Sequence, residues 1–211
     1  EPGVGPAPDR LVDDPSRLLL DNVLNRFRVP GSLYAEGLEA PTGSITYGAA
    51  GIAHFLLRVA RSRDDEVLLA AADQWATRAA SEISTSGAFW NVERGIIPEI
   101  LGHSSLFHHA AGIHCVQALI AHARGDDVGL QRAVDAYCTA SKHCDQIDVP
   151  FGLSGLLTGC ATLLPVVPPH LAAFLMALGH TRSSVILPLL DGQPPLPENC
   201  TMTPFAAASR R

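Results

Sequence analysis

An internal repeat with a period of 61 residues is the feature that most constrains the fold. The segment "TYGAAGIAHFLLRVA", which begins at Thr46, returns as "FHHAAGIHCVQALIA", which begins at Phe107. A weaker third copy, "FGLSGLLTGCATLLP", begins at Phe151. Repeats of this kind are typical of arrays of helical hairpins, in which each unit buries its apolar face against its neighbours.

The repeated segments predict one deeply buried helix per hairpin. These helices should begin near Gly48, His109 and Gly152, and the first is apolar on almost every side. A helix that is apolar all round is buried all round. The small-small-Gly step at each start indicates that the backbone approaches a neighbour closely there, which a larger side chain would prevent.

A second, amphipathic helix follows each buried one. The acidic pairs Asp64-Asp65 and Asp126-Asp127 stand at the same phase of the repeat, where an Asp can cap the next helix. An acidic pair could also bind a metal ion, but capping explains both pairs. The first amphipathic helix carries a single apolar stripe, formed by Leu68, Ala72, Trp75, Ala79 and Ile83.

Alternation of a buried and a half-buried helix predicts an all-α fold with two concentric layers, a partial α/α toroid. We expect a disordered leader over 1–10, the partial toroid over 11–180, and an irregular Pro-rich tail over 181–211. The last helix of the toroid should end at Gly179.

The composition of the chain limits the kinds of partner and the cellular compartment that can be expected. The chain has 211 residues, 47% of them hydrophobic, and a net charge of −6, which disfavours nucleic acid and anionic membranes. Five cysteines, an odd number, suit a reducing cytoplasm. The apolar stretch before Gly179 is interrupted by Pro165, Pro168 and Pro169, so we expect no membrane span. The chain begins with Glu1, not Met, which suggests that it is part of a longer protein.

Three segments, "SITYGAAGIAHFLLRVA", "SLFHHAAGIHCVQALIAHARGD" and "VPFGLSGLLTGCATLL", resemble the first three repeats of the lanthionine synthetase C-like family. The resemblance covers about Ser44 to Leu164 and is closest to cyclase domains fused to a dehydratase or kinase-like region. It implies a toroid of helical hairpins and a precursor peptide as partner, in which cysteine thiols add to dehydrated Ser or Thr residues to form thioether rings.

The resemblance also implies zinc for the complete domain, where the metal holds the substrate sulfur as a thiolate. The family's zinc-ligand motifs, Trp-Cys-x-Gly and Cys-His-Gly, are absent: Trp75 and Trp90 precede Ala and Asn, and no cysteine precedes a histidine. The fourth repeat, with its His-Gly step, is absent too. We therefore expect no metal or other cofactor in this chain, no identifiable catalytic residue, and a peptide-modifying fragment that is inactive alone.

Two clusters of histidine and cysteine residues could suggest metal sites. The first comprises His103, His108, His109, His114 and Cys115. His109 replaces the first glycine of the repeat, and His114 and Cys115 need not share a face with it. The second comprises Cys138, His143 and Cys144, whose spacings of five and six do not suit one helix face. Both clusters are better explained as helix-end and core residues.

Other functions remain open. "GAAG" and "GLSG" resemble phosphate-binding loops, but they follow no predicted strand and recur as packing positions. A sugar-processing α/α toroid would need paired carboxylates in its cavity, and only Glu93 and Glu99 lie near the second repeat. A noncatalytic peptide-binding or scaffold module is the stronger alternative. Exposed flanks of an incomplete toroid also make self-association an expectation.

Overall fold

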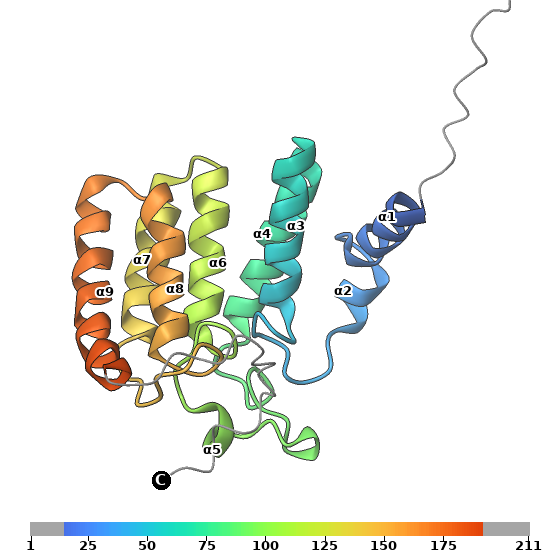
Figure 1. Cartoon of the computed structure of the whole chain (residues 1–211). Coiled ribbons are helices and arrows are strands. Elements are labelled where there is room, and N and C mark those ends of the chain that lie inside the picture. The colour runs from blue at the N-terminus through green and yellow to red at the C-terminus, as the bar shows by residue number, and fades with distance from the viewer. Residues whose placement is uncertain (1–14, 192–211) are drawn as a thin grey trace, which may run out of the picture.

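The computed structural model describes residues 15–191, which form helices and loops without a strand among them (Figure 1). An N-terminal pair, α1 (Pro15–Phe27) and α2 (Ser32–Glu36), precedes three hairpins. The hairpins are α3 (Ala49–Arg63) with α4 (Glu66–Ser81), α6 (Ala110–Ala123) with α7 (Asp127–Ala140), and α8 (Leu153–Leu163) with α9 (Pro169–Leu190). Short helices lie in the connections: η1 (Val92–Arg94), α5 (Pro98–Leu101) and η2 (Leu164–Val166). The all-α prediction is confirmed.

The first helix of each hairpin begins where the repeat predicts. Gly48, His109 and Gly152 are the N-cap residues of α3, α6 and α8, and each has an extended backbone. None of these three caps uses a side-chain hydrogen bond. The starts of these helices must therefore be stabilised by the loops that precede them.

The second helices of the first two hairpins are capped by aspartate. The Asp65 carboxylate accepts a hydrogen bond from the Leu68 N–H at 3.0 Å, and the Asp126 carboxylate accepts one from the Gly129 N–H at 2.8 Å. Asp64 has a different role, because it ends α3 with a left-handed backbone (φ 52°). Asp65 and Asp126 are thus the capping residues of the two acidic pairs.

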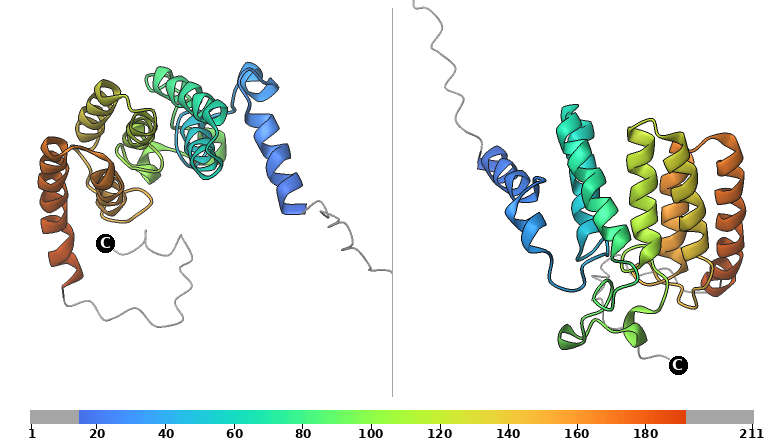
Figure 2. Two further views of the ribbon diagram at one scale, coloured as in Figure 1. Left: turned by 90° about the horizontal axis from the view of Figure 1, so that it is seen from above. Right: turned by 180° about the vertical axis from the view of Figure 1, so that it is seen from behind.

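The three hairpins follow one another along an open arc. Seen from above, α3, α6 and α8 lie on the inner side and α4, α7 and α9 on the outer side (Figure 2). In α6, nine of 14 residues are buried, against four of 14 in α7. The expectation of burial on every side is wrong for α3, where Ile52, His54 and Phe55 are only partly buried. Phe55 packs edge-on against Phe27 of α1, with ring centroids 6.0 Å apart.

The C-terminal helix α9 is longer than expected. The prediction that it ends at Gly179 is wrong, since α9 continues through this residue to Leu190. Beyond Gly179 the helix is held by Arg182 and Ile186, which are both buried. The Arg182 guanidinium donates a hydrogen bond of 2.7 Å to the carbonyl of Ser141 at the end of α7. This packing outweighs the cost of a mid-helix glycine, about 1 kcal/mol.

The boundary drawn at residue 181 for an irregular tail is therefore a misprediction for 181–190. Pro188 does not prevent the helix, because it lies in the last turn, where it removes one backbone hydrogen bond close to the end. The rest of the expected tail, 192–211, and the expected leader, 1–10, lie outside the described residues.

Helix α9 is also apolar enough to meet the composition of a membrane span. Its segment Pro169–Leu189 has a mean hydropathy of 1.2 over the most apolar window. The prolines named above come before or at the start of this helix, so they do not interrupt it. Only 28% of that window is buried, and α9 packs against α7 and α8 through residues that include Leu175 and Arg182. One helix of this length and composition does not by itself indicate a membrane span.

Candidate functional site

The three inner helices α3, α6 and α8 all begin on the same side of the array, at the lower ends of the helices in Figure 1, where the loops that precede them gather. These loops bond to one another directly. The Thr46 N–H donates to the Phe107 carbonyl at 3.1 Å, which links the first repeat to the second. The Ser105 hydroxyl donates to the Pro150 carbonyl at 2.7 Å, which links the second to the third. We call this end the mouth.

The recurring glycines permit a close backbone contact at the mouth. A Cβ atom on Gly51, Gly112 or Gly155 would overlap the carbonyl oxygen of the residue six positions earlier. These oxygens belong to Ile45, Leu106 and Val149. In all three repeats the loop therefore lies directly on the first turn of the inner helix, which explains the glycine in every copy.

The cap residue before each inner helix is glycine in the first and third repeats (Gly48 and Gly152) but His109 in the second. At the first repeat, the carbonyls of Thr42 and Gly43 accept hydrogen bonds from the first two N–H groups of α3, and Gly48 leaves room for this approach. At the second repeat, the first two N–H groups of α6 have no partner within residues 15–191. A Cβ on Gly48 would overlap the Thr42 carbonyl oxygen, so the side chain of His109 leaves no room for an equivalent approach of the loop at the second repeat.

Three rings form a row across the mouth. Tyr47, His108 and Phe151 each stand one residue before an inner-helix cap. The ring centroids of Tyr47 and His108 are 5.6 Å apart, and those of His108 and Phe151 are 5.1 Å apart. We call these residues the ring row. It places one aromatic or imidazole side chain from each repeat side by side.

Residues at the same position of each repeat hold the backbone of the ring row in place. Three positions before each ring stand Ser44, Ser105 and Asp148, whose side-chain oxygens accept hydrogen bonds from the N–H groups of Tyr47, His108 and Phe151. Ser44 and Ser105 are fully buried. The positions of the three rings thus follow from the same local turn, used once in each repeat.

His108 is the central and most buried member of the row. Its side chain is 7% exposed, and its Nδ1 atom is buried without a hydrogen-bond partner among the described residues. Burial lowers the pKa of His108, and the nearby Asp148 carboxylate partly opposes this effect. The imidazole is therefore neutral at pH 7, when it can either donate or accept a hydrogen bond.

A second group of rings adjoins the row. The His109 ring stacks on Phe89 with centroids 4.3 Å apart and an interplanar angle of 17°, and it meets the Trp90 ring at 5.2 Å. Trp90 in turn contacts His103 at 6.1 Å. Burial, with smaller contributions from His103 and His108, lowers the pKa of His109 to about 4. His109 is thus a neutral, stacked ring under ordinary conditions.

The histidines and cysteines of the first predicted cluster separate in the fold. His103, His108 and His109 lie at the mouth, whereas His114 bonds to Gln117 on α6, with Nδ1 and Oε1 3.0 Å apart. Cys115 is buried in the core, and burial raises the pKa of its thiol to about 12. The cluster is therefore not one site.

The second cluster is also dispersed. The Cys144 thiol points to backbone carbonyls, including that of Ser104 at 3.3 Å, and burial raises the pKa of both Cys138 and Cys144. Within residues 15–191, no three side chains of His, Cys, Asp or Glu come together in a way that could hold a metal ion. The zinc implied by the resemblance therefore has no fitting ligand set in the described part of the chain.

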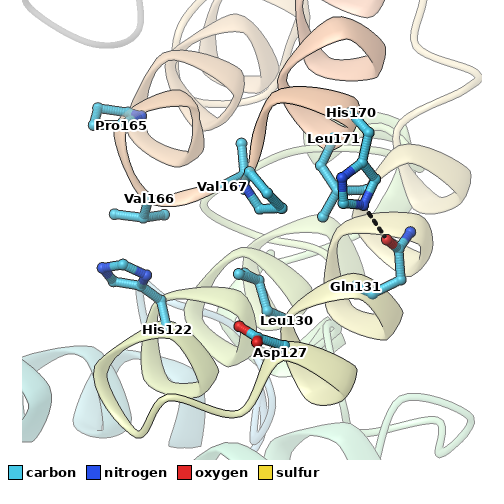
Figure 3. Close-up of a pocket in the computed structure, with 10 residues that line it drawn as sticks. His122, Asp127, Leu130, Gln131, Pro165, Val166, Val167, His170 and Leu171 are labelled. Carbon is cyan, nitrogen blue, oxygen red and sulfur yellow. Dashed lines mark hydrogen bonds between the residues drawn. The ribbon is translucent and has the colours of Figure 1, made fainter.

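A hollow lies away from the mouth, between the second and third hairpins (Figure 3). It has a volume of about 440 Å³ and is lined mainly by the Pro165–Pro168 segment and by the start of α9. Its polar groups include His170 and Gln131, which bond to each other at 3.1 Å. The His122 and Asp127 side chains also line the hollow.

Several residues of the mouth were not identified from the sequence. Ser105 could have been found, because it follows Ser44 by the repeat period of 61 residues. Asp148 is harder to find, since the third repeat is weaker. Phe89 and Trp90 come from the loop after α4, and no periodic signal marks them. The exposed Glu93 and Glu99 lie in the same connection, outside the inner helices.

Comparison with known families gives one match. The family model described as lanthionine synthetase C-like protein matches residues 41–178. This range contains the loops of the mouth, the first two hairpins, α8 and the first part of α9. The searches of curated proteins and of solved structures gave no significant match.

Proposed function

Because the chain belongs to the lanthionine synthetase C-like family, we propose that it is the peptide-binding part of a thioether-forming cyclase and is inactive alone. The single observation that supports this is the ring row. The exposed Tyr47 ring and the half-buried Phe151 ring lie on either side of the buried His108 at the mouth, and accessible rings at this place suit contact with an extended peptide.

The reaction expected of the complete domain needs an activated thiol. The cysteine thiol loses its proton and the sulfur bonds to the β-carbon of a dehydrated residue. The carbon–carbon double bond becomes a single bond and the α-carbon takes up a proton, so no group leaves. A free cysteine has a pKa near 8.5 and is mostly protonated at pH 7. The zinc-ligand motifs are missing from the sequence, and residues 15–191 contain no ligand cluster, which supports the proposal that the chain does not form the thiolate alone.

Binding without catalysis is also the function of the alternative, a scaffold module. The two differ in whether the chain acts beside catalytic repeats, and the same ring row would serve both. A sugar-processing toroid has less support, because Glu93 and Glu99, the carboxylates in the loop before the second repeat, are exposed and lie outside the inner helices. Cytoplasmic location remains part of the proposal.

Peptide binding at the ring row is testable with a labelled synthetic peptide that carries one dehydroalanine and one cysteine. Tyr47 is 53% exposed, so Tyr47→Ala should leave the fold intact. We expect this variant to bind about threefold to tenfold more weakly, as for loss of one aromatic contact, when binding is followed by fluorescence anisotropy.

The matched control is Val128→Ala, which shortens an exposed apolar side chain in the first turn of α7. It should bind the peptide as tightly as the unaltered chain. No binding by the unaltered chain, or equal binding by Tyr47→Ala, would contradict the proposed site.

A further inference from the structure

The hollow between the second and third hairpins lies at the end of the helices opposite the mouth. It is found where the α6–α7 connection meets the α8–α9 connection (Figure 1), and its volume is about 440 Å³. Pockets for small ligands in proteins typically measure about 300–1,000 Å³. We call it the far hollow. Because it is separate from the ring row, a test of its function is independent of peptide binding at the mouth.

The floor of the far hollow is apolar. Leu130 of α7 and Leu171 of α9 are each 3% exposed, and Val166 and Val167 add apolar lining from the connection between α8 and α9 (Figure 3). The two valines are only partly buried. Part of this apolar surface is therefore available to an alkyl chain, and covering it would be favourable through the hydrophobic effect.

The polar side chains of the far hollow stand at its rim, where they are exposed. Among residues 15–191, neither the Asp127 carboxylate nor the His122 imidazole has a hydrogen-bond or ion-pair partner. No Lys or Arg of the described residues lines the far hollow. Arg124, close by in the sequence, is already paired with Asp73. The lining therefore carries a negative charge that no residue of the lining neutralises.

The hydrogen bonds of Gln131 determine what His170 can offer. The Gln131 amide nitrogen donates to the Asp135 carboxylate at 3.0 Å, so the Gln131 amide oxygen is the atom that meets His170. The Nε2 atom of His170 must then donate to that oxygen, at 3.1 Å. In the neutral imidazole this leaves Nδ1, which lies on the side of Val167 in Figure 3, as a hydrogen-bond acceptor.

An apolar floor below a rim of acceptors suits an alkyl chain that ends in a cation. We propose that the far hollow binds an organic cation of this kind, an ammonium or guanidinium group on an apolar chain of about three to five carbons, as in arginine and lysine side chains. The chain lies on Leu130 and Leu171. The charged group stays at the rim, in contact with water, and donates to the Asp127 carboxylate and to Nδ1 of His170.

Pentylammonium, pentanol and pentanoate test the proposal, because they share one alkyl chain and differ in charge. Each is titrated into the isotope-labelled full chain at about pH 8, where an ordinary imidazole is neutral, and binding is followed by the shifts of assigned amide NMR signals. We expect pentylammonium to bind with a Kd on the order of 1–10 mM, as for so small a ligand, and to shift the signals of Leu130 and Leu171. Pentanol should bind at least about fivefold more weakly, and pentanoate should not bind measurably.

The charge of Asp127 is tested by Asp127→Asn, which keeps the shape of the side chain. This variant should bind pentylammonium at least about fivefold more weakly than the unaltered chain. The matched control is Asp145→Asn, the same substitution in the exposed loop after α7, which does not line the far hollow. It should bind as the unaltered chain does, and circular dichroism of both variants confirms that helix content is retained.

Equal binding of the three probes would overturn the proposal, as would equal binding of pentylammonium by Asp127→Asn and the unaltered chain. Shifts confined to residues outside the far hollow would also contradict it. Titration with N-acetyl-lysine amide distinguishes the sources of the cation. Binding at least as tight as that of pentylammonium would indicate a lysine side chain of a peptide, and weaker binding would indicate a free amine.

Discussion

At the scale of single residues, the glycines of the mouth are the most constrained positions. Gly112 is the clearest, because an added Cβ would overlap the Leu106 carbonyl oxygen, and backbone cannot move aside as a flexible side chain can. The sequence indicated a close approach at these glycines but not the partner, since the loop carbonyl six residues earlier is recognisable only once the loop has folded back.

We predict that Gly112→Ala lowers the free energy of unfolding by about 1–3 kcal/mol, as for other overpacked sites. Urea denaturation followed by circular dichroism measures this. Gly87→Ala is the control, because a Cβ there would meet only the Ala40 side chain at an ordinary 3.5 Å. Equal loss in both variants would contradict the proposed contact.

His109 is the second residue with a measurable signature. Its pKa is about 4 in the folded chain and about 6.5 when unfolded, so the unfolded state binds more protons between these values. The stability contributed by neutral His109 is complete above pH 6.5 and is lost as the pH falls towards 4.

We therefore predict that His109→Gln loses less stability than the unaltered chain between about pH 7 and about pH 4.5, by about 1–2 kcal/mol after allowance for solvent screening. Urea midpoints at the two pH values give the difference. Other histidines with lowered pKa values contribute equally to both proteins. Parallel pH profiles would show that His109 is not buried as described.

At the scale of helices, periodicity located the caps of α3, α6 and α8 correctly but not the end of α9. The caps follow from local chemistry that repeats with the sequence. The continuation of α9 beyond Gly179 depends on Arg182, which reaches the carbonyl of Ser141 on another hairpin. Such a contact between distant segments leaves no local pattern, and for the same reason the ring row was not predicted.

The acidic pairs give a prediction at this scale. Asp126→Ala should cost about 1 kcal/mol, because it removes the cap of α7, whereas Asp127→Ala, in the first turn, should cost less. Thermal unfolding by calorimetry compares the two. A metal-binding pair would instead make both substitutions equal and dependent on added divalent cations, which would contradict capping.

At the scale of the whole molecule, the described arc joins a mouth of three repeats to an α8–α9 edge without a further described hairpin. The family match and the three hairpins agree on the architecture. We propose that the chain contributes peptide binding but not thiol activation. The Trp-Cys-x-Gly and Cys-His-Gly motifs do not occur in its sequence.

The most direct test is the loss of free thiol from the dehydrated, cysteine-containing peptide, counted over time by alkylation and mass spectrometry in chelator-treated buffer. We predict the same rate with and without the chain, at concentrations where anisotropy shows the peptide bound. Ring formation clearly faster than the uncatalysed rate would contradict the account, because it would mean that the first three repeats activate the thiol themselves.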